Sequence, residues 1–151
     1  MGTVKDLARL LSTVRTVGLD SMAFVYHFEG HSTYGPLTRA LFSRIEDGSL
    51  SACTSVLTLC EVLTGARKAG DAGLVQVYQQ VFELMPNLSV VAIDSPCAAL
   101  AATLRLEAGL RTPDALQLAT AIRWGAEAFI TNDGRLRRVA QIKVIVLSDY
   151  A

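Results

Sequence analysis

The chain lacks an apolar run long enough to cross a bilayer, which takes about 18 to 20 residues. Runs such as 98–102 and 144–147 have the length of buried strands or short helical segments instead. Charged residues at positions 5, 6, 9 and 15 also interrupt the apolar core that a signal peptide needs. We therefore expect a cytoplasmic protein that has no membrane partner.

The sequence also lacks an excess of charge, since 14 Lys and Arg residues balance 14 Asp and Glu residues. This balance excludes a protein that coats nucleic acid through bulk positive charge, although it allows a local basic patch. Cys53, Cys60 and Cys97 form no CxxC pair, and we expect reduced core residues rather than disulfides or a zinc site. A Gly-rich P-loop is missing as well, so nothing supports nucleotide hydrolysis.

What the chain does have is the composition of one globular domain, with 51% hydrophobic and 19% charged residues. Short apolar segments predict strands at 16–20, 50–54, 89–93, 128–131 and 143–147. Helical periodicity and caps predict helices at 3–14, 22–28, 36–45, 56–68, 72–85, 95–109 and 112–124. A short basic helix is expected after Gly134. Strands that alternate with helices indicate an α/β fold, in which helices cover both faces of a parallel sheet.

Residues 1–15 form an N-terminal extension, which precedes the domain proper at 16–151. Thr3 can cap a helix here, and apolar residues follow at helical spacing: Val4, Leu7, Leu10, Leu11 and Val14. We expect this helix to pack on the domain, with a docking segment or a frayed tail as the alternatives.

The helix predicted for 56–68 has two different faces. Its apolar face has the i, i+3, i+4, i+7 spacing and consists of Val56, Leu59, Cys60 and Leu63. A second stripe is polar or small, so that a ligand can approach it, and consists of Thr54, Thr58, Glu61 and Gly65.

Four acids have local settings that suit chemistry: Asp20, Glu61, Asp114 and Asp133. Asp20 and Asp133 directly follow apolar strands, where open α/β sheets place their ligands. Asp114 lies in the first turn of a helix for which Thr112 is the predicted N-cap and Pro113 the first residue, and there the helix dipole favours the ionised form. If the strands at 16–20 and 128–131 are neighbours, all four acids can meet at one end of the sheet.

Several carboxylates close together repel one another, and a divalent cation with oxygen ligands relieves that cost. A bound cation can also lower the pKa of water and stabilise the transition state of phosphodiester cleavage. The four acids therefore indicate a metal-dependent enzyme that cuts a nucleic acid, with RNA favoured. Arginines at 111, 135, 137 and 138 are candidates for phosphate contacts.

Each acid also has an ordinary structural interpretation. Asp114 can be a first-turn acid, Glu61 a solvated helix residue and Asp133 a turn residue. Asp94 also follows a predicted strand, but we assign it to the turn before Ser95 because that strand is expected at an edge. Catalysis by His27 or His31 is disfavoured because no second ligand lies at metal spacing.

The four acids lie in segments that match a known family in order and spacing. The segments are Leu19–Ser21, Thr58–Leu63, Arg111–Ala121 and Phe129–Leu136. With them the chain resembles the PIN domain, and within it the VapC-type toxin ribonucleases of type II toxin–antitoxin pairs. Two departures are the 15 residues before the first strand and Met22, where the family often has Asn.

The resemblance implies a three-layer α/β/α fold with a five-stranded parallel sheet in the order 3-2-1-4-5. It implies Mg²⁺ or Mn²⁺ at Asp20, Glu61, Asp114 and Asp133, and cleavage of single-stranded RNA by an activated water. Ser21 and Thr131 match supporting hydroxyls, and Asn132 adjoins the site. The expected protein partners are an antitoxin, whose C-terminal segment covers the site, and a second copy in a homodimer.

Other functions remain open from the sequence. A PIN-like nuclease can act in RNA processing without being a toxin, and a PIN-like module can bind without cutting, although the four acids argue against the latter. An aspartyl-phosphate enzyme is disfavoured, because Met22 stands where dehalogenase-like enzymes need an Asp. A receiver domain is disfavoured too, since it needs an acid pair after the first strand, where Asp20 and Ser21 supply only one.

Overall fold

The computed structural model describes residues 2–151, so Met1 of the predicted extension lies outside the described residues. Its sheet has five parallel strands in the order β3-β2-β1-β4-β5, as expected. They are β1 (Thr16–Leu19), β2 (Ser51–Ser55), β3 (Leu88–Val91), β4 (Ala128–Thr131) and β5 (Lys143–Val146). β1 is central, because Val17 pairs with Ala52 on one side and with Ala128 on the other. The strand order reverses between β1 and β4.

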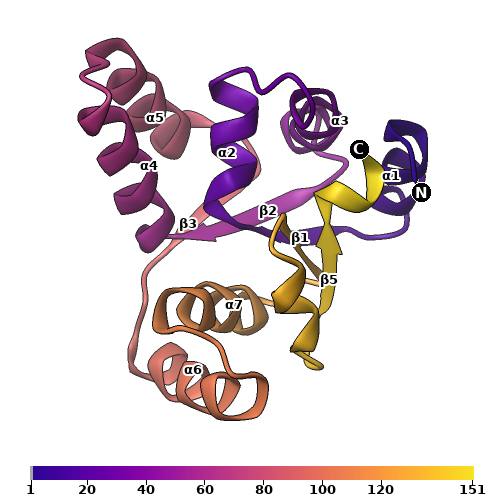
Figure 1. The fold of residues 1–151 in the computed structure, drawn as a ribbon, viewed down its shortest axis with the longest axis vertical. Helices are drawn as coiled ribbons and strands as arrows, with labels where there is room; N and C mark the ends of the chain where they lie inside the picture. Colours follow the sequence, from indigo (N-terminus) through magenta and orange to yellow (C-terminus); the bar gives the residue numbers. More distant parts are fainter. Residues whose placement is uncertain (1) are drawn as a thin grey trace.

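The helices lie in a layer on each face of the sheet (Figure 1). One layer contains α2 (Ser21–Phe28), α3 (Gly35–Glu46), α4 (Val56–Lys68) and α5 (Ala72–Leu84). The other contains α6 (Ser95–Ala108) and α7 (Thr112–Trp124), followed in sequence by β4 and the 3₁₀ segment η1 (Gly134–Arg138). A hydrophobic core fills each side, with Phe24, Leu41 and Tyr78 in the first, and Leu104 and Phe129 in the second.

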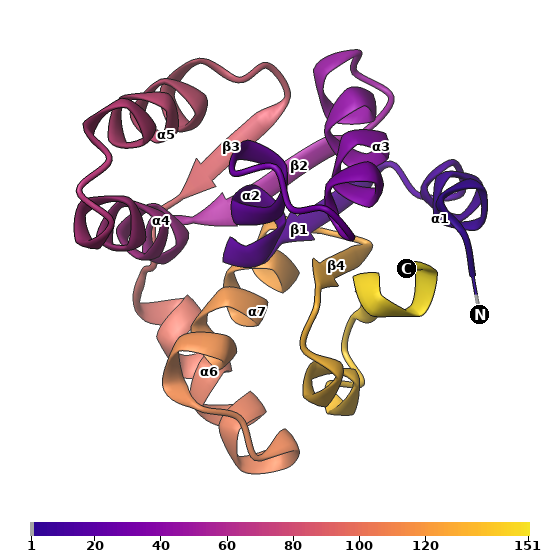
Figure 2. The same ribbon diagram turned by 45° about the horizontal axis from the view of Figure 1, so that its top comes forward.

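The first core extends to the N-terminal helix, α1 (Val4–Leu11), which buries Leu7 and Leu11. Thr3 caps this helix as predicted, in a capping box with Asp6. Just before α1, Gly2 N donates to the Asp149 carbonyl oxygen at 2.8 Å. This hydrogen bond joins the N-terminal segment to the C-terminal 3₁₀ segment, η2 (Leu147–Tyr150). Figures 1 and 2 both show α1 beside α3, close to the C-terminus. The helix predicted for 3–14 is thus observed at Val4–Leu11, with Leu7 and Leu11 packed in the first core.

Gly18 lets α7 approach the central strand closely. A Cβ atom at this position would lie 2.6 Å from Ala121 Cβ and 2.9 Å from the Phe129 ring. Neither neighbour can retreat easily, because Ala121 is on α7 and Phe129 is on the adjacent strand. The contact places the start of α7, with Asp114, near the end of β1.

Two sequence predictions are wrong for α4. The face of Val56, Leu59, Cys60 and Leu63 is not the buried one, since Val56 is 43% exposed and Cys60 is exposed. The buried stripe is Thr58, Val62 and Ala66 instead. Thr58 can be buried because its hydroxyl accepts a hydrogen bond from Gln117 Nε2 at 2.6 Å. Cys60 is therefore a surface thiol, whereas Cys53 and Cys97 are buried as expected.

The start of α7 differs slightly from the prediction, because Arg111 rather than Thr112 is its N-cap, and no side chain caps it. Asp94 caps α6 by accepting a hydrogen bond from Cys97 N at 2.9 Å, after the edge strand β3. Asp94 is therefore a helix cap rather than a turn residue. Within residues 2–151, no helix combines the length and the apolar character needed to span a membrane.

Candidate active site

The four predicted acids line one pocket of about 430 Å³. They reach it from four places: the end of β1, the polar stripe of α4, the first turn of α7 and the turn after β4. This is the carboxyl end of the sheet, at the reversal of strand order where open α/β sheets bind ligands. Met22, Val25, Tyr26 and Val62 form the less polar part of the wall.

Asp20 lies at the base of the pocket and also caps α2. Its Oδ1 accepts a hydrogen bond from Ser21 N at 2.8 Å, and its Oδ2 accepts one from the Thr131 hydroxyl at 2.7 Å. Burial raises the pKa of Asp20, and the nearby charges of Asp114 and Glu61 raise it further, against these two hydrogen bonds. The carboxylate is thus oriented by neutral donors, and among residues 2–151 it forms no ion pair with a basic side chain.

Glu61 is oriented by neutral donors as well. Its Oε1 accepts hydrogen bonds from the Ser21 hydroxyl at 2.7 Å and from Gln117 Nε2 at 3.2 Å. Gln117 Oε1 in turn accepts from the Ser55 hydroxyl at 2.7 Å. Ser55, Thr58 and Gln117 are buried, so this network joins β2, α4 and α7 beneath the pocket.

Gln117 is the site residue that the sequence analysis missed. It lies one turn after Asp114, on the same side of α7, and it holds Glu61 across the pocket. The i, i+3 spacing from Asp114 is the only local pattern that could have pointed to it.

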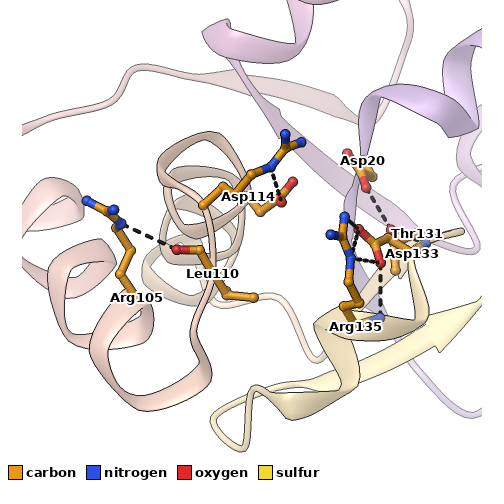
Figure 3. A network of polar contacts seen from close by, with 8 residues as sticks. Asp20, Arg105, Leu110, Asp114, Thr131, Asp133 and Arg135 are labelled. Atoms are coloured by element: carbon orange, nitrogen blue, oxygen red, sulfur yellow. Dashed lines mark hydrogen bonds and ion pairs between the residues drawn. The ribbon is translucent and has the colours of Figure 1, made fainter.

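Asp114 and Asp133 differ from the first two acids because each has an arginine partner. Arg111 Nε lies 3.9 Å from Asp114 Oδ2, yet burial still raises the pKa of Asp114. Arg135 Nε donates to Asp133 Oδ1 at 3.0 Å, and Arg135 Nη2 donates to Asp133 Oδ2 at 2.7 Å. These hydrogen bonds lower the pKa of Asp133. Figure 3 shows Asp133 and Arg135 facing the helix that carries Asp114.

The supporting residues take different roles. Thr131 donates to Asp20, and Ser21 donates to Glu61, so both hold acids of the pocket. Asn132 lines the pocket, but its side chain is already bonded, with Nδ2 donating to the Tyr26 hydroxyl and Oδ1 accepting from Ser148 N. These two hydrogen bonds fix the position of Asn132 in the turn between Thr131 and Asp133. Neither histidine lines the pocket.

Among residues 2–151, no group of three or more His, Cys, Asp or Glu side chains lies close enough to hold a metal ion as it stands. The donor set nevertheless fits a hard divalent cation, because all four acids offer carboxylate oxygens. Burial and mutual repulsion raise the pKa of both Asp20 and Asp114. Asp20 and Glu61 form no ion pair with a basic residue among residues 2–151, whereas Asp114 and Asp133 do, so a cation would neutralise charge mainly on the side of Asp20 and Glu61.

The fold and the acidic pocket define a three-layer α/β/α protein with a ligand site at the reversal of strand order. The family model of the PIN domain matches residues 17–142, and the chain belongs to this family. A comparison with curated proteins gave no significant match.

Solved structures with this fold come from toxin–antitoxin complexes. A chain of a complex from Klebsiella pneumoniae has a TM-score of 0.68 at 23% identity, over 87% of this chain and 97% of that one. A chain of VapBC2 from Rickettsia felis, bound to a promoter DNA fragment, has a TM-score of 0.66 at 19% identity, over 87% of this chain and 98% of that one. A chain of FitAcB from Neisseria gonorrhoeae has a TM-score of 0.68 at 20% identity, over 87% of this chain and 98% of that one.

Proposed function

We propose that this protein is a metal-dependent endoribonuclease that cleaves single-stranded RNA, and that it is the toxin of a toxin–antitoxin pair. The observation that carries the proposal is the pocket at the end of β1, into which four separate elements of a PIN domain bring Asp20, Glu61, Asp114 and Asp133. The reaction is hydrolysis, in which water adds to phosphorus and one P–O bond of the backbone breaks.

Asp20, Glu61, Asp114 and Asp133 would hold Mg²⁺ or Mn²⁺. When bound, the cation supplies Lewis acidity and a lowered pKa for water. The chain's own residues position the carboxylates: Thr131 fixes Asp20, and Ser21 with Gln117 fixes Glu61. Val25 and Val62 form an apolar part of the pocket wall on the side of α2 and α4.

The proposed protein partners are an antitoxin and a second copy of the chain. Solved structures of the same fold are components of toxin–antitoxin complexes.

The first experiment is cleavage of a mixed single-stranded RNA pool with Mg²⁺, with Mn²⁺ or with EDTA. We expect cutting only with metal, and a loss of at least about 100-fold for Asp20→Asn, because it removes a buried ligand charge. Asp94→Asn is the matched control, since Asp94 also follows a strand and caps a helix but lies outside the pocket. Cutting that survives EDTA and Asp20→Asn would refute the proposal.

A second experiment tests the toxin role. Induced expression of the wild type in bacteria should arrest growth, whereas Asp20→Asn should not. Co-expression of the product of a small adjacent gene should restore growth. Active RNA cleavage without growth arrest would instead favour a role in RNA processing.

A further inference from the structure

A second, smaller pocket lies beside the acidic one and shares Asp114 with it. It has a volume of about 200 Å³. Three arginines line it, and we call it the arginine pocket: Arg111 at the start of α7, and Arg135 and Arg138 on η1. Arg105 Nε donates to the Leu110 carbonyl oxygen at 3.3 Å, which braces the loop before Arg111 (Figure 3).

The three guanidinium groups are in different states. Arg135 is bound to Asp133 by a forked pair of hydrogen bonds, and Arg111 lies 3.9 Å from Asp114. Arg138 forms no ion pair and no side-chain hydrogen bond among the described residues 2–151. Its Nη1 lies 3.8 Å from the position that a Cβ of Gly109 would take, at the rim of the pocket.

This combination suits a phosphate group. A guanidinium fork matches two phosphate oxygens, and a cluster of arginines concentrates positive charge in a recess. The α7 N-terminus adds to the attraction, because no side chain caps it and its dipole end is positive. A nucleic acid strand that places one phosphate at the four acids would bring a neighbouring phosphate to these arginines.

We propose that the arginine pocket is a subsite for a backbone phosphate of the RNA next to the one that is cleaved. This inference rests on the proposed nuclease function. Arg138 is available for the phosphate in the free protein, whereas Arg135 is held by Asp133. Arg135 occupies both Asp133 oxygens, where a cation held by the acids would compete with it. This competition would free Arg135 to bind the phosphate, so that metal and RNA would favour each other's binding.

The subsite is tested by RNA binding without cleavage, using fluorescence anisotropy of a labelled single-stranded RNA in EDTA. We expect Arg138→Gln to weaken binding 3- to 10-fold and to reduce the salt slope by about 0.7, the value for one phosphate contact on a single strand. Arg137→Gln is the matched control: it is in the same 3₁₀ turn but is paired with Asp149. We expect the affinity of Arg137→Gln for the RNA to differ less than twofold from that of the wild type. Equal effects of the two variants would overturn the subsite.

The release of Arg135 is tested by calorimetry of Mn²⁺ binding to the free protein. Arg135→Gln removes the competitor at Asp133, so we expect Mn²⁺ to bind at least threefold more tightly. Arg138→Gln removes the same charge from the same pocket without freeing an acid, so it should change Mn²⁺ affinity less than twofold. Similar gains for both variants would show a general charge effect and overturn the exchange.

The two proposals fail in different ways. If the wild type cuts RNA but Arg138→Gln binds RNA as tightly as the wild type, only the subsite is wrong. If the wild type neither cuts nor binds single-stranded RNA, the nuclease function is wrong and the subsite falls with it.

Discussion

The two halves of the acidic pocket hold their carboxylates by different means. On the side of β1 and α4, Asp20 and Glu61 are held by neutral hydroxyl and amide donors. On the side of α7 and η1, Asp114 and Asp133 lie beside arginines that are themselves exposed. Neutral donors fix a carboxylate without cancelling its charge, whereas arginines cancel charge and can be displaced. The first half is thus a rigid, charged base, and the second half is adjustable.

The largest stability effect is expected in the rigid half. Gln117→Ala leaves the buried hydroxyls of Ser55 and Thr58 with one partner fewer and releases Glu61. We expect a loss of about 2–3 kcal/mol in the free energy of unfolding, because unsatisfied buried polar groups cost that much. Urea denaturation measures it. Gln80→Ala on α5 is the control, since that glutamine is exposed, and a loss of equal size there would contradict the comparison.

A smaller effect is expected when one donor in this half is removed without loss of volume. Thr131→Val keeps the shape of the side chain but no longer donates to Asp20, and it also loses the hydrogen bond that Thr131 accepts from Asp133 N. We expect Mn²⁺ affinity to fall about 10-fold, as is typical when a group that orients a ligand is lost. Calorimetry at fixed pH provides the measurement, with Thr64→Val as control because Thr64 is exposed on α4 and bonds only the Cys60 carbonyl. An unchanged affinity would mean that Asp20 needs no orientation.

The ionised carboxylate of Asp20 in the rigid half should also lower the free energy of unfolding when no metal is bound. The folded pKa of Asp20 is raised, mainly by burial, so its ionised form is favoured in the unfolded chain. At neutral pH, Asp20→Asn should therefore raise the melting temperature by about 2–4 °C, the shift that about 1 kcal/mol gives a domain of this size.

This gain has a definite pH dependence. It should disappear as the pH falls through the folded pKa of Asp20, because the wild-type group is then neutral as well. Thermal melts in EDTA across the acidic range check the sign. Asp94→Asn should show no such gain, since hydrogen bonds from Cys97 lower the pKa of that cap. A gain for Asp20→Asn that grows toward acidic pH would contradict the argument.

The smallest stability effect is expected in the adjustable half. Arg135→Gln removes the partner of Asp133, but the arginine side chain is 61% exposed, and ion pairs screened by solvent contribute little to folding. We expect no measurable shift of the urea midpoint. A loss as large as that for Gln117→Ala would show that both halves are rigid.

Local patterns predicted most of the framework. Strand positions and the cap Thr3 follow from short stretches of sequence, and the structure confirms them. The strand order came from the family resemblance, because periodicity does not say which strands pair. The sequence could single out Asp20 and Asp133 because Asp20 directly follows β1 and Asp133 follows β4 after one residue.

The errors arose where distant residues decide the outcome. Periodicity assigned Val56 and Cys60 to the apolar face of α4, but the core accepts Thr58 because Gln117, 59 positions away in sequence, satisfies its hydroxyl. The brace on Glu61 was missed for the same reason. Arg135 and Asp133 are close in sequence, but only the fold shows that their ion pair lies in a pocket with acids from three other elements.

Gly18 has a consequence for how the sequence can vary in evolution. Any side chain here would push against Ala121 and Phe129 and move α7 away from β1. Asp114 and Gln117 travel with that helix, so the separation of Asp20 from its partners would change too. We therefore expect homologous sequences to keep glycine at this position or to change it together with Ala121 or Phe129. The lack of a side chain at Gly18 thus sets how far α7 lies from β1, although Gly18 itself does not line the pocket.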